Sequence, residues 1–237
     1  MIDFSGQTVL VVGGSSGIGF ATAQLAAELG ASVTIASRSA EKTQAAAARI
    51  GIGAIARTLD VTNDTEVASF FADGTTWDHV IVTGSQVSIA AVRELPLETA
   101  HAAFDSKYWG FYRVARAAVI RPGGSLSVVS GFLASRPTAG RALMGSINAA
   151  LEALVRGLAL EVKPVRVNVV SPAVVATEMW GGMSEEARGA MFEKVAAHYP
   201  AGRPGQPEDI ARQLLLLAAT GYATGTVVML DGGASIA

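Results

Sequence analysis

Short runs of apolar residues alternate along this chain with longer segments in which apolar residues recur at helical spacing. The runs are rich in valine and isoleucine and predict seven strands, at residues 8–14, 32–38, 54–61, 78–84, 125–131, 165–172 and 226–233. The segments between them predict helices at 20–29, 42–50, 67–72, 97–120, 143–161 and 209–219. Strands that are apolar on both sides are typical of a parallel sheet covered by helices on both faces. The pattern therefore predicts one α/β domain over residues 1–237, with a mostly parallel seven-stranded sheet.

The long stretch 173–207 shows neither an apolar run typical of a strand nor the apolar spacing of a helix, and it contains Trp180, His198 and Tyr199. In doubly wound α/β folds, ligands bind beyond the carboxyl ends of the strands. An insertion at that end of the sheet more often serves a ligand than merely connects two elements. We therefore expect residues 173–207 to form a substrate-side loop or lid.

Composition and charge exclude several classes of function. The chain is 50% hydrophobic and 16% charged, with a net charge of −2 and no cysteine. A weakly acidic balance argues against nucleic acid or an anionic membrane surface as a partner. The lack of cysteine removes disulfides, thiolate metal sites and a cysteine nucleophile, and it suits a reducing compartment. No leader opens the chain and no apolar run approaches the ~18 residues of a membrane span, so we expect a cytoplasmic protein.

Metal and hydrolase chemistry find no support in the sequence. His79, His101 and His198 lack the spacing of a metal site, so no metal is expected. A Ser-His-Asp hydrolase would need a nucleophile elbow, and the chain has none.

A glycine-rich loop, GGSSGIG at residues 13–19, lies between the first predicted strand and the first helix. Gly13 permits a tight turn, Gly17 lets the backbone approach a pyrophosphate, and Gly19 lets the helix pack close to the strand. A turn that needs positive φ would also select glycine. The strand, the three glycines and the helix together favour dinucleotide binding in a Rossmann-type doubly wound fold.

The wide glycine spacing resembles that of the short-chain dehydrogenase/reductase family. Further segments resemble the family in the same order: Asp60-Val61, VRVNVVSPAVVATEM (165–179), GRPGQPEDIA (202–211) and TGTVVMLDGG (224–233). The resemblance implies cofactor contacts along the whole carboxyl edge of the sheet. The implied cofactor-binding residues are Gly13, Ser15, Ser16, Gly17, Ile18, Gly19, Ser37, Arg38, Asp60, Val61, Thr83, Gly84, Lys107, Asn148, Val175 and Thr177.

The end of the second strand favours NADP(H) as the cofactor. Family members that bind NAD place an acid there to hold the ribose diol, whereas this chain has Ser37 followed by Arg38. An acid would repel a 2′-phosphate, and an arginine can bind it by charge-assisted hydrogen bonds, with Ser15 and Ser37 as further donors. The alternative is that Arg38 is a solvated charge at the start of a helix.

The four positions where the family carries its catalytic Asn, Ser, Tyr and Lys hold different residues here. The resemblance aligns them with Lys107, Gly131, Met144 and Asn148, and the phrase that closes the fourth strand reads Thr83-Gly84-Ser85. Methionine cannot donate a proton, and the loss of a positioned general acid costs ~10²–10⁴ in rate.

Lysine and asparagine, however, have exchanged places, so the pocket keeps one ammonium and one amide. Lys107 would be partly desolvated there, which would lower its pKa and suit it to proton transfer. Ser130 and Ser146 are the nearest hydroxyls along the chain.

Two functions remain open at this point. The first is an NADP(H)-dependent oxidoreductase for a carbonyl/alcohol pair, with Lys107, Asn148 and Ser130 as its catalytic residues. The second is a non-catalytic NADP(H)-binding sensor or partner protein. The intact glycine loop argues against a relative that uses no cofactor.

The substrate and the assembly are predicted only in outline. Met144, Trp180 and Met183 favour a small-molecule substrate of apolar character. The resemblance implies a homo-oligomer, a tetramer or a dimer. Tyr108, Phe111 and Tyr112 are expected to point outward as part of its interface.

Overall fold

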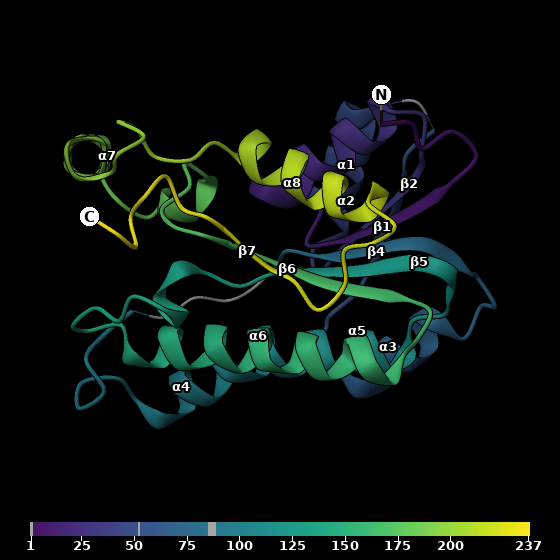
Figure 1. Ribbon diagram of the computed structural model, residues 1–237, viewed down its shortest axis with the longest axis horizontal. Helices are drawn as coiled ribbons and strands as arrows, with labels where there is room; N and C mark the ends of the chain where they lie inside the picture. Colours follow the sequence, from purple (N-terminus) through teal and green to yellow (C-terminus); the bar gives the residue numbers. More distant parts are fainter. Residues whose placement is uncertain (1, 52, 85–88) are drawn as a thin grey trace.

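A seven-stranded sheet forms the centre of the computed structural model, which describes residues 2–51, 53–84 and 89–237 (Figure 1). Its strand order is β3-β2-β1-β4-β5-β6-β7, and all neighbouring strands run parallel. The strands are β1 (Thr8–Val12), β2 (Ser32–Ser37), β3 (Ile55–Thr58), β4 (Trp77–Val82), β5 (Ile120–Val129), β6 (Arg166–Pro172) and β7 (Val227–Leu230). This order confirms the predicted doubly wound fold. The order reverses between β1 and β4, and such a switch point opens a crevice for a ligand.

Helices cover both faces of the sheet. In Figure 1, α1 (Gly17–Glu28), α2 (Ala40–Ile50) and α8 (Pro207–Ala219) lie above it. The opposite face is covered by α3 (Asp64–Phe71), α4 (Leu97–Phe104), α5 (Gly110–Ala117) and α6 (Ala142–Glu161). The remaining helix, α7 (Glu185–His198), lies off the sheet near the C-terminus.

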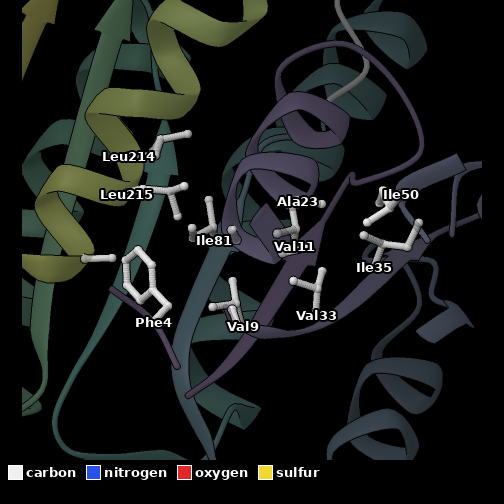
Figure 2. Packing of buried hydrophobic residues seen from close by; sticks show 14 of the residues in the cluster. Phe4, Val9, Val11, Ala23, Val33, Ile35, Ile50, Ile81, Leu214 and Leu215 are labelled. Atoms are coloured by element: carbon white, nitrogen blue, oxygen red, sulfur yellow. The ribbon is translucent and has the colours of Figure 1, made fainter. Parts of the chain in front are cut away.

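Each face of the sheet has its own apolar core. Along β1, Val9 and Val11 pack toward α1 and α8, whereas Leu10 and Val12 pack toward the helices of the other face. Figure 2 shows the first core, where Val9 and Val11 lie near Leu215 of α8 and Ala23 of α1. Because side chains alternate along a strand, a strand buried on both faces is apolar at most of its positions. The continuous apolar runs of the sequence have this cause.

The predicted helix 97–120 differs in detail from the structure. A π-helical turn, η1 (Asp105–Trp109), joins α4 to α5, and the N–H of Gly110 donates to the oxygen of Asp105, five residues earlier. The helix ends at Ala117, and β5 begins at Ile120, earlier than predicted. The expectation that Phe111 points outward is wrong, because its side chain is fully buried in the core beneath α5. A wider turn shifts every later residue around the helix axis, so a simple helical period misplaces these side chains.

Residues 173–207 are not irregular throughout. They contain the 14-residue helix α7, whose N-cap Ser184 accepts a hydrogen bond from the N–H of Ala187 and whose first turn carries Glu185 and Glu186. Only Val195 of this helix is buried, so it shows no apolar stripe from which periodicity could reveal it. The N-cap serine and the two acids are the signals that could have done so.

Helix α6 has the length and hydropathy of a membrane span, and within the described ranges no other helix does. Its residues Ile147, Leu151 and Val155 are fully buried against the rest of the protein. The core helix of a globular domain has the same composition, and the packing of α6 corresponds to that case.

Candidate active site

A cavity of about 660 Å³ opens at the carboxyl ends of β1, β4, β5 and β6, next to the switch point of the sheet. Its walls come from the glycine loop, the ends of β4 and β5, one side of α6 and the segment after β6. Among the residues that line it are Gly13, Ser16, Gly17, Ile18, Gly19, Thr83, Gly84, Lys107, Ser130, Gly131, Met144, Asn148, Val175, Thr177 and Trp180. This is the place where a doubly wound sheet binds its ligand.

The glycine loop is pressed against the end of β4. A Cβ atom on Gly13 would lie 2.2 Å from the backbone nitrogen of Gly84, and one on Gly19 would lie 2.1 Å from the oxygen of Gly13. Gly13 also has a φ of 86°, which disfavours other residues. Any side chain at these two positions would push α1 away from the sheet, so both must be glycine.

The start of α1 fits the phosphates of a dinucleotide. Its N-cap Ser16 makes no capping hydrogen bond, and its first turn contains no acid. The N–H groups of Gly17, Ile18 and Gly19 have no acceptor within the helix, and all three residues line the cavity. Free N–H groups at a helix N-terminus bind phosphate. Glu178 also lines this part of the cavity, but its side chain is exposed and can turn away from an anion.

The predicted cofactor residues divide into two groups. Those that line the cavity are Gly13, Ser16, Gly17, Ile18, Gly19, Thr83, Gly84, Lys107, Asn148, Val175 and Thr177. Five others lie beside it, near the loop or at the ends of β2 and β3: Ser15, Ser37, Arg38, Asp60 and Val61. Ser85, from the altered phrase after β4, lies outside the described residues.

The polar side chains beside the cavity differ in whether other residues of the protein already bind them. Arg38 is exposed and has no ion-pair partner within the described ranges. The Ser37 hydroxyl is hydrogen-bonded to that of Thr43, and Asp60 accepts from the N–H and hydroxyl of Thr62. Among these predicted residues, Arg38 is thus the one that is most free to bind an anion.

Lys107 lies in the middle of the π-helical turn and reaches into the buried side of the cavity. Its Nζ donates to the Oδ1 atom of Asn148 at 2.7 Å and to the backbone oxygen of Ser130 at 2.8 Å. The structure thus brings Lys107 and Asn148 into direct contact. The ammonium has a third N–H, for which the described part of the chain holds no acceptor. π-helical turns often occur at functional sites, because they redirect a side chain without ending the helix.

Burial lowers the pKa of Lys107 to about 8, because the charged form is poorly solvated there. The negative charge of Glu152 acts in the opposite direction and supports the ammonium. A lysine with a pKa near neutrality can both give and take a proton under physiological conditions.

Glu152 is a buried acid on α6 that organises the hydroxyls behind Lys107. One of its carboxylate oxygens, Oε1, accepts hydrogen bonds from the hydroxyls of Ser130, at 2.9 Å, and Ser171, at 3.1 Å. A serine hydroxyl has only one proton to donate. Ser130 therefore cannot donate to a substrate while it bonds Glu152, and its part in this geometry is to position Lys107 through its backbone oxygen.

Gly131 and Asn148 depend on one another for space. A Cβ atom on Gly131 would lie 2.7 Å from the Nδ2 atom of Asn148. Any larger residue at position 131 would force this amide to move. Ser146, the other hydroxyl named from the sequence, donates to the oxygen of Ala142 in its own helix and is exposed.

Sequence reasoning missed four charged residues of the site. Lys42, Arg141 and Glu178 line the cavity, and Glu152 lies directly behind it. One of them carries a spacing signal, because Glu152 follows Asn148 by one turn on an otherwise apolar helix face. Within the described ranges, no group of His, Asp and Glu residues could hold a metal ion.

Comparison with known proteins identifies the family. A family model described as Enoyl-(Acyl carrier protein) reductase matches residues 12–235. The chain is 31% identical to the short-chain dehydrogenase/reductase ATR9 of Stachybotrys chlorohalonatus over 249 residues, with 97% of each protein covered. The chain belongs to the short-chain dehydrogenase/reductase family. Homologues in this family are oxidoreductases, and the family binds a nicotinamide cofactor.

Two further matches describe proteins of the same size. The 3-oxoacyl-(acyl-carrier-protein) reductase of Chlamydia trachomatis is 31% identical over 244 residues, with 96% of both proteins covered. The crystal structure of a small-chain dehydrogenase in complex with NADPH superposes with a TM-score of 0.82, at 32% identity and with 98% of this chain and 99% of the other covered. In both comparisons the match spans nearly the whole length of this chain and of the other protein.

Proposed function

We propose that this protein is an NADP(H)-dependent oxidoreductase that interconverts a carbonyl and an alcohol, with Lys107 as its proton donor. The observation that carries the proposal is the Lys107 ammonium, which is buried at the cavity wall and fixed by Asn148 and Ser130, with one N–H left for a ligand. By the family resemblance, Lys107, Gly131, Met144 and Asn148 replace the usual Asn, Ser, Tyr and Lys, so the tyrosine acid is absent.

The residues of the cavity can support the reaction in the following way. NADPH, when bound, supplies the hydride that adds to the carbonyl carbon. The ammonium of Lys107 donates a hydrogen bond to the carbonyl oxygen and passes its proton to that oxygen as negative charge develops there. Lys107 is then neutral and regains a proton from water. Asn148 holds Nζ in place through Oδ1, and its Nδ2 remains to donate to a hydroxyl of the cofactor ribose.

Turnover is the direct test of this proposal. NADPH oxidation is followed by absorbance at neutral pH with a panel of aldehydes and ketones of differing length and polarity. Oxidation that depends on the carbonyl compound supports the proposal. If NADPH binds but no carbonyl compound is reduced, the non-catalytic nucleotide-binding function takes its place. The cytoplasm, where NADPH is maintained, is the compartment that we propose for this activity.

The cofactor preference rests on Arg38. Arg38→Ala removes a charged partner of the 2′-phosphate, so we expect it to weaken NADPH binding by ~10- to 100-fold and to leave NADH binding almost unchanged. Fluorescence titration measures both affinities. Arg49→Ala is the matched control, because that guanidinium lies over the ring of Phe20, 4.2 Å from its centre. Equal affinity of the unmutated protein for NADPH and NADH would contradict the preference.

We also propose a homo-oligomer, a tetramer or a dimer. Trp109 and Tyr112 are exposed on the side of η1 and α5, their rings 5.5 Å apart, and Leu160 is exposed on α6. Met229 and Tyr222 are exposed near β7. Exposed apolar groups on the surface of η1, α5 and α6 and on the surface near β7 favour contacts between copies of the chain. Light scattering at micromolar concentration should give a mass of two or four chains, and a monomer mass would refute this proposal.

A further inference from the structure

One side of α6 lines the cavity from its inner end to its mouth. Arg141, which directly precedes the helix, and Met144 and Asn148 all contribute to the wall. Residues three, four and seven positions apart lie on the same side of a helix. Asn148 is at the Lys107 end of this row. Arg141 is seven residues away, which is roughly 10 Å along the axis at about 1.5 Å per residue.

The guanidinium of Arg141 has no ion-pair partner in the part of the chain that the structure describes. It makes no ion pair and no side-chain hydrogen bond there, and the first turn of α6 contains no acid. Arg141 is nevertheless half-buried. Among the described residues that line the cavity, Glu178 is the one acid, and it lies near Gly17 at the glycine-loop end. A partly buried cation that has no protein counter-charge is free to pair with an anionic ligand.

The surroundings of Arg141 place it on the substrate side of the cavity. Burial and the negative charge of Asp231 raise the pKa of the Tyr199 hydroxyl, and the positive charge of Arg141 lowers it. The Asp231 carboxylate accepts hydrogen bonds from the N–H groups of Gly233 and Ser235 and forms no ion pair with Arg141. Arg141 therefore lies near the Tyr199 hydroxyl. That hydroxyl is hydrogen-bonded to the backbone of Val174, which lines the cavity just after β6. The phosphates of a dinucleotide would bind at the opposite wall, at the start of α1. Arg141 is therefore not needed for the cofactor.

The wall between Lys107 and Arg141 is apolar. Met144 is buried in it, and Leu133 and Phe132 line the cavity beside it. An elongated ligand along α6 would meet a hydrogen-bond donor at one end, methionine and leucine side chains in the middle, and a cation at the other end.

From this arrangement we infer that the substrate carries a carboxylate that pairs with Arg141, roughly 10 Å along α6 from the oxygen that reacts at Lys107. The inference rests on the proposed function, because it takes Lys107 as the place of the reacting oxygen. The substrate class is thus a carbonyl or hydroxyl compound with an apolar body and a distal carboxylate.

Binding of three probes of equal length tests this assignment without any turnover. The probes are 8-hydroxyoctanoate, octane-1,8-diol and 8-aminooctan-1-ol, each titrated by calorimetry into the protein saturated with NADPH, which cannot react with an alcohol. We expect the carboxylate to bind ~10- to 100-fold more tightly than the diol, and the amine to bind most weakly. Arg141→Gln should remove the preference for the carboxylate, and Arg141→Lys should keep part of it.

Arg156→Gln is the matched control, because Arg156 is exposed on the same helix and outside the cavity. Equal binding of the carboxylate and the diol, failure of all three probes to bind, or a preference that survives Arg141→Gln would each overturn the inference. Because NADPH is not consumed, a protein without reductase activity can still show the preference, and an active enzyme can lack it. The two proposals therefore fail separately.

Discussion

Lys107→Met is expected to lower the rate of carbonyl reduction by ~10²- to 10⁴-fold, the usual effect of losing a positioned general acid. Methionine matches the length of the lysine stem and suits a buried site, so the change removes the charge and the proton with little change in shape. NADPH binding should also weaken, but by a smaller factor. Stopped-flow measurement of NADPH oxidation and a fluorescence titration separate the two effects.

The pH dependence of the same reaction identifies the acid. Because the pKa of Lys107 is lowered to about 8, the rate should fall as the pH rises through about 8, where the ammonium loses its proton. The residual rate of Lys107→Met should show no step in this range. Lys194→Met, at an exposed lysine of α7, is the control and should keep the full rate and its pH profile. A Lys107→Met variant with the unmutated rate would remove Lys107 from the mechanism.

Protein stability offers an independent measure of the Lys107 environment. In the unfolded chain the lysine has its ordinary pKa of 10.5, whereas in the folded protein it is about 8. Between these values the unfolded state binds more protons, so the folded state gains stability as the pH rises from about 8 to 10.5. Lys107→Met should lack this gain when unfolding is followed by denaturant titration.

The fold was predictable from the sequence because its central strands are buried on both faces. Runs such as that of Val9, Leu10 and Val11 have no polar position, and all seven predicted strands lie in the sheet. The boundaries were less predictable where the backbone departs from a simple period, as at the π-helical turn before Gly110. Helix α7 was missed for a different reason, because it is almost entirely exposed and its polar residues carry no burial pattern.

Many residues of the site were predictable from the sequence, but the hydrogen bonds between them were not. The resemblance indicated that Lys107 and Asn148 belong to one pocket, and the structure joins them directly. It did not indicate that Ser130 would hold Lys107 by its backbone and bond Glu152 by its hydroxyl. Which group a serine bonds depends on the tertiary packing of β5 against α6, and no local pattern in the sequence encodes that choice.

Asn148→Lys alone is expected to be the most destabilising change at the site. It would place a second ammonium where the Asn148 amide now lies, whose Oδ1 is 2.7 Å from the Nζ atom of Lys107. Two like charges in a buried pocket repel, and an uncompensated buried charge costs about 3–5 kcal/mol. For a chain of this size we expect a fall in Tm of about 10 °C. Asn148→Met is the size-matched neutral control and should cost less, because it adds bulk without adding charge.

Combining Lys107→Asn with Asn148→Lys tests whether the lysine and the asparagine act as a unit. Lys107→Asn alone removes the ammonium, leaving buried Glu152 without its nearby cation and Ser130 without a donor to its backbone oxygen. Together with Asn148→Lys it returns one ammonium and one amide to the pocket, so the double variant should recover most of the Tm and of the NADPH affinity. The coupling energy between the two sites should then exceed about 2 kcal/mol, as for residues in direct contact. Turnover should not return, because the ammonium would then enter the pocket from α6 and not from η1, away from the position proposed for proton donation to the substrate oxygen. If the losses of the two single variants simply add, Lys107 and Asn148 do not form a unit, and their exchange is a coincidence of sequence drift.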